Sequence, residues 1–397
     1  MASGRPSASL ALVTRAARMM ATDVSVQLAV TPAEEVDAAL AADACMSWLA
    51  EVDAHLSRFR AESELCRLNA ASGRWFTASV LLYEAVVCAI HAAETSGGLF
   101  DPTLLPLLEA AGYDRDFALI AHRETHPVPS GQALSSPGGD LAEDAEPAPT
   151  GLAAWREIEC DAASRRIRLP RGARMDLGGI AKGWAADVAL ERFCGPFANA
   201  LVNVGGDLRL RGGPAENEAW SIGIRDPRRE PLESGVVAPD AYAALVTISR
   251  GGLATSGAVR RWWLCNGERR HHLLDPRTGR PVPLWLDEDD DVAPEDGGQP
   301  LVATATALAP TAARAEVAAK VALLRGYPAA LRAVEDAWAR AGSVARDGDC
   351  DTGVALALAL GSGDVVISTN MAEYLATWGT AGAPLSTTVY NDRDNRE

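Results

Sequence analysis

Apolar residues recur at helical spacing along several stretches of this chain. The clearest stretch covers residues 31–57, where the spacing places apolar side chains on one face of an α-helix. Thr31-Pro32-Ala33-Glu34 opens it with a capping residue, a proline at the first helical position and a glutamate that completes a capping box. The sequence therefore predicts a long amphipathic helix here. Its apolar positions are Val36, Leu40, Trp48, Val52 and Leu56.

The same pattern predicts further helices and several short strands. Helical spacing continues over residues 79–95, 180–193, 311–324 and 329–341. Strand-like runs separated by glycine-rich turns cover residues 167–169, 200–204, 220–224, 245–249 and 354–360. Because these strands and helices do not alternate regularly, the mixture favours an α+β fold with a largely antiparallel sheet over a doubly wound sheet.

Composition and charge narrow the class of protein. Residues 127–150 and 283–300 are rich in proline, glycine and acidic residues and lack apolar periodicity, so we expect both to be flexible surface insertions. The formal net charge of the chain is −16. Since this charge would repel a phosphate backbone, nucleic acid is not an expected partner.

Cysteine usage and hydropathy bear on the compartment. The seven cysteines are scattered and contain no Cys-x-x-Cys pair, which is typical of reduced thiols in a cytosolic protein. The apolar stretch at residues 10–14 is too short for a secretory signal. No run approaches the ~20 apolar residues that a membrane helix needs. We therefore expect a cytoplasmic protein without membrane insertion.

A Gly-Gly turn between a predicted strand and a predicted helix is the sharpest local motif. The motif D-L-G-G-I-A-K-G occupies residues 176–183. Gly178 and Gly179 would present free backbone N–H groups at a helix start, and Lys182 would add an ammonium group, so the turn could hold a pyrophosphate. Two simpler interpretations stay open: the glycines merely reverse the chain, and Asp176 serves as a helix cap.

Two more segments carry polar side chains at turns. An apolar strand runs into Gly205, Gly206 and Asp207, which on its own indicates a hairpin turn. Farther along, and after the hydroxyl groups of residues 254–257, Asp275 begins an Asp-Pro-Arg-Thr-Gly turn, and His272 lies three residues before it. This density of imidazole, carboxylate, guanidinium and hydroxyl groups suits phosphate binding and proton transfer. Composition equally allows a polar surface turn.

Taken in order, these motifs resemble those of the ApbE family, the FAD:protein FMN transferases. The resemblance implies an ApbE-like fold with helices flanking the sheet and a deep FAD cleft. It covers residues 20–326 as a flavin transferase domain, with residues 327–397 as a C-terminal extension packed on the same domain. The motifs are L-S-R-F at 56–59, G-L-F-D-P-T at 98–103, D-L-G-G-I-A-K-G at 176–183, N-V-G-G-D at 203–207, A-T-S-G at 254–257 and H-x-x-D-P-R-T-G-x-P at 272–281.

The resemblance also implies an activity. A family member moves the FMN moiety of FAD onto a Ser or Thr hydroxyl of an acceptor flavoprotein and releases AMP. Hydrolysis of FAD to FMN and AMP, or FAD binding without catalysis, stay open as alternatives. His272 is implied as the catalytic group, with Asp275 orienting it or holding the turn. The positions implied to contact FAD are Met20, Phe59, Asp101, Ala110, Ala111, Gly112, Asp176, Gly178, Gly179, Lys182, Gly205, Gly206, Asp207, Thr255, Ser256 and His272.

The chain departs from the family pattern where the family binds Mg²⁺. The family helix offers an aspartate and a threonine one turn apart, whereas this chain has Glu316 and Lys320. The resemblance implies Glu316 and the carbonyl of Gly179 as metal ligands, with Lys320 at the position of the threonine. The simplest interpretation of the pair is an i,i+4 salt bridge. In the alternative, the ammonium group replaces the charge of the cation at the pyrophosphate.

Overall fold

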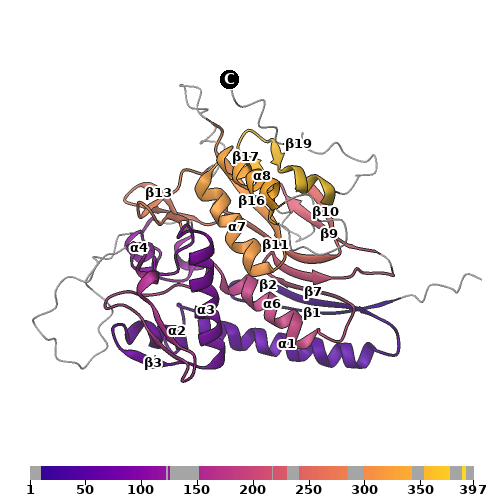
Figure 1. The fold of residues 1–397 in the computed structure, drawn as a ribbon, viewed down its shortest axis with the longest axis horizontal. Coiled ribbons are helices and arrows are strands. Elements are labelled where there is room, and N and C mark those ends of the chain that lie inside the picture. The colour runs from indigo at the N-terminus through magenta and orange to yellow at the C-terminus, as the bar shows by residue number, and fades with distance from the viewer. Residues whose placement is uncertain are drawn as a thin grey trace, which may run out of the picture. The chain divides into compact units, whose positions relative to one another are not determined.

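The structure is a computed structural model of the full chain. It describes residues 10–121, 124–125, 152–216, 218–229, 241–284, 299–341, 353–375 and 387–389. The predicted insertion at 127–150 lies outside these residues, as does nearly all of the one at 283–300. The chain divides into two compact units (Figure 1). The first unit comprises Met1–Asp53, Lys182–Gly257 and Leu284–Glu397, and the second comprises Ala54–Ala181 and Ala258–Pro283.

A nine-stranded sheet forms the frame of the first unit. All neighbouring strands in it run antiparallel except β18 and β19, which are parallel. The prediction of an α+β fold with a largely antiparallel sheet is confirmed. In sheet order the strands are β1 (Ala11–Met19), β2 (Thr22–Val30), β7 (Asn199–Val204), β8 (Asp207–Arg211), β11 (Arg250–Gly257), β16 (Val302–Ala309), β17 (Ala355–Leu360), β18 (Val365–Ile367) and β19 (Thr387–Val389).

A separate antiparallel hairpin completes the strands of this unit. It pairs β9 (Trp220–Arg225) with β10 (Tyr242–Ile248). Buried side chains of the hairpin and of the large sheet share one hydrophobic core, in which Val246, Leu210 and Ile367 are fully enclosed. The core therefore lies between the hairpin and the sheet. Apolar side chains that alternate along the strands point into it.

Four helices belong wholly or mainly to the first unit: α1 (Glu35–Leu56), α6 (Ala181–Phe193), α7 (Ala312–Arg325) and α8 (Ala329–Ala341). Helix α7 packs on β8, β11 and β16 (Figure 1). Helices α1 and α6 meet through aromatic rings, with the centroids of Trp48 and Trp184 5.9 Å apart. Helix α6 and the start of α7 approach so closely that a Cβ on Gly183 would lie 2.6 Å from the carbonyl oxygen of Ala312. Only glycine fits there.

The helix predicted from residue 31 exists, with a different apolar face at its start. Thr31 and Glu34 form the capping box, since the Thr31 N–H donates to the Glu34 carboxylate at 2.9 Å. Val36 and Leu40 are nevertheless 73% and 64% exposed. Alanines at positions 38 and 42 take the buried side instead. Small side chains bring the helix close to its neighbours. Hydrophobic spacing alone does not reveal that alanines, and not the larger apolar residues, occupy the buried face.

The second unit combines short helices with small sheets. Its helices are α2 (Glu64–Ala70), α3 (Val80–Thr95), α4 (Leu105–Ala110) and α5 (Phe117–Ile120). One antiparallel sheet has the order β3 (Trp75–Thr77), β6 (Arg166–Arg168) and β5 (Glu159–Asp161). A second has the order β13 (Glu268–His271), β12 (Trp262–Cys265) and β4 (Glu124–Thr125), and β14 (Leu274–Asp275) pairs with β15 (Arg280–Pro281).

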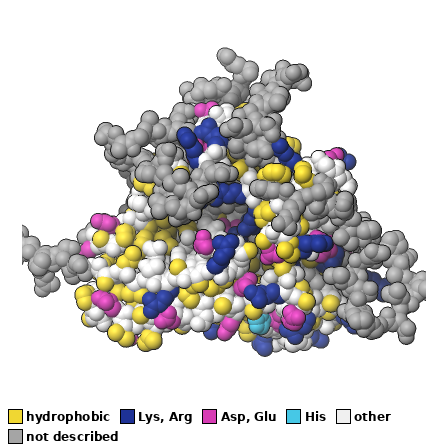
Figure 2. All heavy atoms as spheres, turned by 180° about the vertical axis from the view of Figure 1, so that it is seen from behind, with side chains coloured by type: hydrophobic (Ala, Val, Ile, Leu, Met, Phe, Trp, Pro, Cys, Tyr) yellow, Lys and Arg dark blue, Asp and Glu magenta, His cyan; other side chains and the backbone are white. Residues whose placement is uncertain are grey.

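The surface carries charges of both signs. On the face shown in Figure 2, lysine and arginine side chains lie among aspartate and glutamate side chains rather than gathering into one basic area. Among the helices that the structure describes, none combines the length and the apolar character needed to cross a membrane.

Candidate functional site

In the second unit, two contacts from distant segments fix the backbone around Asp176. The side-chain amide of Asn69 donates to the carbonyl of Met175 at 2.9 Å and accepts from the Met175 N–H at 2.8 Å. The next N–H, that of Asp176, donates to the carbonyl of Pro102 at 2.9 Å. Asn69 and Pro102, the latter in the G-L-F-D-P-T motif, therefore act together here, because both hold the segment that ends at Asp176.

The Asp176 carboxylate meets a guanidinium and a backbone amide. Its Oδ1 lies 3.7 Å from Nε of Arg58 and accepts from the Gly178 N–H at 3.0 Å. Bonding to an N–H two residues ahead gives Asp176 the turn-forming contact of an Asx turn. The Asp176 side chain is still 20% exposed, so the carboxylate also reaches solvent.

Arg58 is the residue of this site that sequence reasoning missed. Its side chain is 5% exposed, and its guanidinium lies 4.1 Å from the ring centre of Phe59 and 4.3 Å from that of Tyr113. Nη1 donates to the Tyr113 carbonyl at 2.9 Å, whereas the buried Nη2 has no hydrogen-bond partner among the described residues. A buried donor without a partner is costly, and it suits an acceptor atom of a bound ligand. The L-S-R-F motif was the available signal.

Aromatic rings extend this cluster toward helix α4. The rings of Tyr113 and Trp263 are 5.2 Å apart, and the fully buried Trp263 donates through Nε1 to the carbonyl of Ala111 at 2.7 Å. Ala110 ends α4, and Gly112 follows with φ +94°, a left-handed conformation that glycine adopts without strain. Phe59, Asp176, Gly178 and the Ala110–Ala111–Gly112 turn are thereby linked through one network of contacts in this unit.

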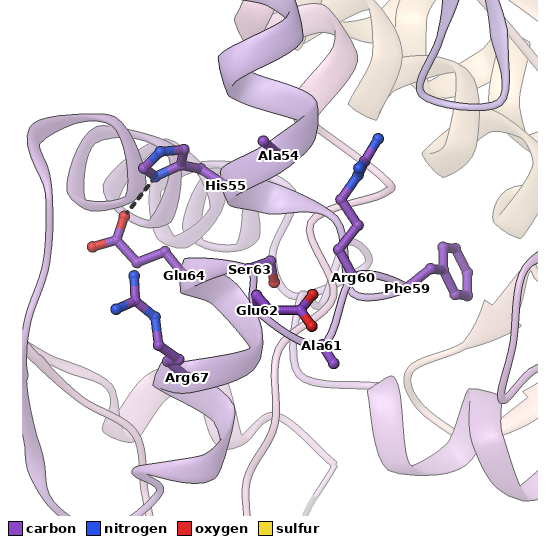
Figure 3. A pocket seen from close by; sticks show the side chains of 9 residues that line it. All are labelled: Ala54, His55, Phe59, Arg60, Ala61, Glu62, Ser63, Glu64 and Arg67. Carbon is purple, nitrogen blue, oxygen red and sulfur yellow. Dashed lines mark hydrogen bonds and ion pairs between the residues drawn. The ribbon is translucent and has the colours of Figure 1, made fainter.

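A pocket of about 520 Å³ lies beside Phe59 in the same unit. Figure 3 shows the Phe59 ring at one end and the pair of His55 and Glu64 at the other. His55 Nδ1 and Glu64 Oε2 are 3.2 Å apart. Burial opposes ionisation of Glu64, but hydrogen bonds from Ser79 and the contact with His55 hold the pKa of Glu64 below its usual value. Glu64 is therefore a structural anion that holds the cap of helix α3.

The two adjacent histidines have different environments. His271 is 4% exposed; its Nε2 contacts the Val282 carbonyl at 2.9 Å and its Nδ1 accepts from the Leu273 N–H at 3.2 Å. Burial lowers the pKa of His271, so this ring is a neutral structural group. His272 is half-buried. Of the pair, His272 keeps the access to solvent that a reacting group needs.

Asp275 and Asp101 both have their carboxylates committed to turns. Asp275 accepts from the backbone N–H of Arg277 at 2.8 Å and pairs with the guanidinium of Arg277, which lowers the pKa of Asp275. Asp101 accepts from the Thr103 N–H at 2.7 Å and from the Ala153 N–H at 3.0 Å. The contacts of Asp275 correspond to the turn-holding role, one of the two roles predicted for it.

In the first unit, four charged side chains from three elements meet. Lys182 of α6 forms an ion pair with Asp207 of β8, and its Nζ lies 3.4 Å from Oε1 of Glu316 in α7. Lys320, one helical turn after Glu316, places its Nζ 3.1 Å from the same Oε1. The other oxygen, Oε2, accepts from the Gly183 N–H at 2.8 Å. We call these four side chains the charge cluster.

The two carboxylates of the charge cluster titrate differently. Burial opposes ionisation of Glu316, but Lys182, Lys320 and the Gly183 N–H together hold its pKa below the usual value. Burial raises the pKa of Asp207 to about 6, against the attraction of Lys182. Glu316 is thus an anion that both ammonium groups contact, and Lys182 also pairs with Asp207.

The charge cluster does not fit a divalent cation. Both oxygens of Glu316 already face donors, one the two ammonium groups and the other a backbone N–H. A metal ion on this carboxylate would meet like charge at close range. Within the described ranges, no group of three or more His, Cys, Asp or Glu side chains is arranged to hold a metal ion.

The remaining predicted residues of the first unit lie on strand turns and on a central strand. Gly205 and Gly206 form the two-residue turn between β7 and β8, as the local hairpin interpretation predicted, and Gly205 donates to the Asp23 carbonyl at 3.0 Å. Met20 lies in the β1–β2 turn with φ 53°. Thr255 on β11 and Thr306 on the neighbouring strand β16 share a hydroxyl hydrogen bond of 2.8 Å, and Ser256 follows Thr255 on β11.

Known proteins with the same pattern place the chain in a family. The family model described as "ApbE family" matches residues 20–341. An FAD:protein FMN transferase of Treponema pallidum is 29% identical over 287 residues, which make up 69% of this chain and 72% of that protein. One of Vibrio cholerae is 30% identical over 239 residues, 59% of this chain and 63% of that protein, so the match spans less than two thirds of its length.

Solved structures agree in fold. The ApbE protein of Thermotoga maritima superposes with a TM-score of 0.67 at 22% sequence identity. The superposition covers 92% of this chain and 100% of the Thermotoga chain. The apo flavinyl transferase ApbE of Pseudomonas stutzeri gives a TM-score of 0.63 at 20% identity, with 93% and 98% covered. Because the family model matches most of the length of this chain, the chain belongs to the ApbE family.

Proposed function

We propose that this chain is an FAD:protein FMN transferase, which moves the FMN moiety of FAD onto a Ser or Thr hydroxyl of an acceptor flavoprotein. The family match over residues 20–341 and the names of the relatives support this activity. The main structural support for this activity is the charge cluster. Its two ammonium groups are partly exposed, and its two carboxylates are buried beneath them. Such a surface suits the pyrophosphate of FAD.

The proposed reaction is a substitution at the FMN-side phosphorus. The acceptor hydroxyl oxygen forms the new P–O bond, and the P–O bond to the AMP phosphate breaks, so AMP leaves with the electron pair. His272 takes the proton of the attacking hydroxyl as general base. Lys182 and Lys320 stabilise the negative charge that develops on the phosphate oxygens. The step needs positioning more than covalent chemistry from the protein.

Taken by itself, the second unit also offers groups that suit parts of FAD. Arg58 offers a buried N–H donor, and Phe59 offers an aromatic face that is 39% exposed. The Gly178 N–H is already bonded to Asp176, but Gly179 lies just before the start of helix α6, and a helix start favours anionic groups. In this proposal Asp176, fixed by Asn69 and Pro102, binds a donor group of FAD.

Domain organisation and compartment follow the same proposal. We assign residues 20–326 to the flavin transferase domain and residues 327–397 to an extension packed on it, which the pairing of β17 with β16 supports. We place the protein in the cytoplasm because its scattered cysteines suit a reducing compartment. Fractionation of cells, with immunodetection of the chain, tests the location.

The activity is tested by incubating the full chain with FAD and a candidate flavoprotein. Covalent FMN on a Ser or Thr, read by mass spectrometry, together with AMP in equal amount, is the expected result. AMP that forms equally without the acceptor would instead establish FAD hydrolysis. A third outcome is that the chain binds FAD but forms no AMP with any acceptor that carries accessible Ser or Thr residues. That outcome would leave FAD binding without catalysis as the function.

A further inference from the structure

The only two lysines of the chain occupy one site. The sequence has 37 lysine and arginine residues, and Lys182 and Lys320 are its only lysines. They lie 138 positions apart in the sequence, on α6 and α7, yet both ammonium groups contact Oε1 of Glu316, at 3.4 and 3.1 Å. Everywhere else the cationic side chain is arginine. At this site the cations are compact ammonium groups, each with three donors, and not planar guanidinium groups.

The charge cluster is layered from the interior outward. The side chains of Glu316 and Asp207 are 1% and 3% exposed, whereas those of Lys320 and Lys182 are 14% and 20% exposed. The carboxylates thus anchor the ammonium groups from beneath. Lys320 directs two N–H bonds at Glu316, one to Oε1 and one to the main-chain carbonyl at 3.4 Å. Since an ammonium group has three donors and the described residues take up two of them, the third is available to a ligand on the exposed side.

The backbone makes this arrangement rigid. The Gly183 N–H fixes Oε2 of Glu316 at 2.8 Å. Asp187, one turn farther along α6, accepts from the Ala312 and Ala313 N–H groups at 2.8 and 2.9 Å. These contacts join α6 to the start of α7, so the two helices that carry the lysines are held against each other beside Glu316.

We propose that Lys182 and Lys320 take the place of a divalent cation in this chain and bind the FAD pyrophosphate directly, without Mg²⁺. The inference rests on the proposed function, because that function supplies the pyrophosphate. The ammonium pair provides two positive charges beside Glu316, which is the charge of one divalent ion, and the buried carboxylates of Glu316 and Asp207 hold this pair from beneath. The pair also closes the carboxylate of Glu316 to that ion by filling the space around Oε1.

The uniqueness of the two lysines gives a direct test on the wild-type chain. With lysine as the only ¹³C- and ¹⁵N-labelled residue, the side-chain NMR signals report Lys182 and Lys320 alone. FAD should shift both sets of signals in the presence of a chelator, and Mg²⁺ alone should shift neither. Inorganic pyrophosphate should shift the same signals. Lysine signals that respond to Mg²⁺ alone, or that ignore FAD, would overturn the inference.

Variants test the same point by affinity. Calorimetry should give wild-type FAD affinity that changes less than about twofold between chelator and excess Mg²⁺. Lys320→Thr should weaken FAD binding in chelator by about tenfold, the value of one charge-assisted hydrogen bond, and Mg²⁺ should restore part of it. Arg314→Thr, which removes an exposed cation from the same helix, is the matched control and should bind FAD as the wild type does.

The outcomes separate this inference from the proposed function. FAD binding that strictly requires Mg²⁺ in the wild type would overturn the metal-free site even if FMN transfer occurs. Lysine signals that shift with FAD in chelator, in a chain that never transfers FMN, would uphold the site and end the transferase proposal. The labelled wild type needs no substitution, so a variant that fails to fold does not affect the test.

Discussion

Asn69 and Met175 are joined by two hydrogen bonds, through both polar atoms of the asparagine amide, across 106 residues of sequence. Met175 directly precedes Asp176, so this pair sets the position of the Asp176 carboxylate. Asn69→Asp keeps the shape of the side chain but removes the donor and buries a charge. We expect it to lower the free energy of unfolding by about 1–3 kcal/mol and to weaken FAD binding, measured by urea unfolding and by calorimetry.

A neighbouring variant separates the two effects. Ser72→Ala removes a hydrogen bond to the Pro170 carbonyl, 2.8 Å long, in an adjoining loop. It should cost about 1 kcal/mol of stability and leave FAD affinity unchanged. Equal FAD affinities of Asn69→Asp and the wild type would show that Asn69 does not position the site.

Arg58 combines a planar cation, two aromatic faces and an uncommitted donor. Arg58→Lys keeps the charge but loses the stacking on Phe59 and Tyr113. We expect FAD affinity to fall about tenfold, which corresponds to about 1.4 kcal/mol. Arg166→Lys is the matched control, since Arg166 lies over the exposed Trp75 ring at 5.1 Å. The role assigned to Arg58 fails if both variants bind FAD as the wild type does.

His272 and His91 are expected to respond differently to substitution. His272→Ala should lower the rate of FMN transfer by about 10²–10⁴, the range of a lost general base, with little change in FAD affinity. His91→Ala, on the exposed side of helix α3 with its side chain 73% exposed, should leave the rate unchanged. A loss of less than tenfold in His272→Ala would remove His272 from the chemical step.

The pH dependence of stability should depend on Asp187. Burial raises the pKa of Asp187 from 3.8 to about 6, although the Ala312 and Ala313 N–H groups and Arg209 favour the charged form. Between these values the native state binds more protons than the unfolded state, so this residue makes stability fall as the pH rises. The loss amounts to about 3 kcal/mol by pH 7.

Asp187→Asn removes this titration. Urea unfolding of the wild type and Asp187→Asn should therefore show a stability difference that shifts by up to about 3 kcal/mol between pH 4 and pH 7, in favour of the variant at the higher pH. A difference that stays constant over this range would mean that Asp187 titrates as an ordinary surface aspartate.

Capping residues and apolar spacing within a segment predicted many helices and strands. Elements that depend on packing between distant segments were not predicted. Helix α7 begins after its Thr311 cap, and β17 closely follows the predicted apolar run. The β1–β2 hairpin was not predicted, because its turn uses Met20 and Ala21 with φ 53° and 54° and lacks the Gly or Asn that marks such turns. Tertiary packing tolerates the positive φ there, and no sequence rule anticipates it.

The site shows the same division. The motifs identified Asp176, Lys182 and Glu316 one at a time, as residues of suitable chemistry. The contact between Lys182 and Glu316 spans 134 residues, and it depends on how α6 and α7 pack, which spacing along the chain does not reveal. Without that contact, Lys320 could be interpreted as a surface partner of Glu316. With it, Glu316 is shared between two cations.

Gly183 has a consequence for how the chain tolerates mutation. A Cβ at this position would lie 2.6 Å from the Ala312 carbonyl oxygen and 2.7 Å from the Ala313 nitrogen, and both are main-chain atoms that cannot rotate aside. In a saturation library, codon 183 should therefore accept glycine alone, although glycine carries no reactive group. Even the methyl group of alanine would push α6 away from α7 and separate Lys182 from Glu316. Inactive variants at codon 183 would record lost spacing between helices, with every functional side chain still present.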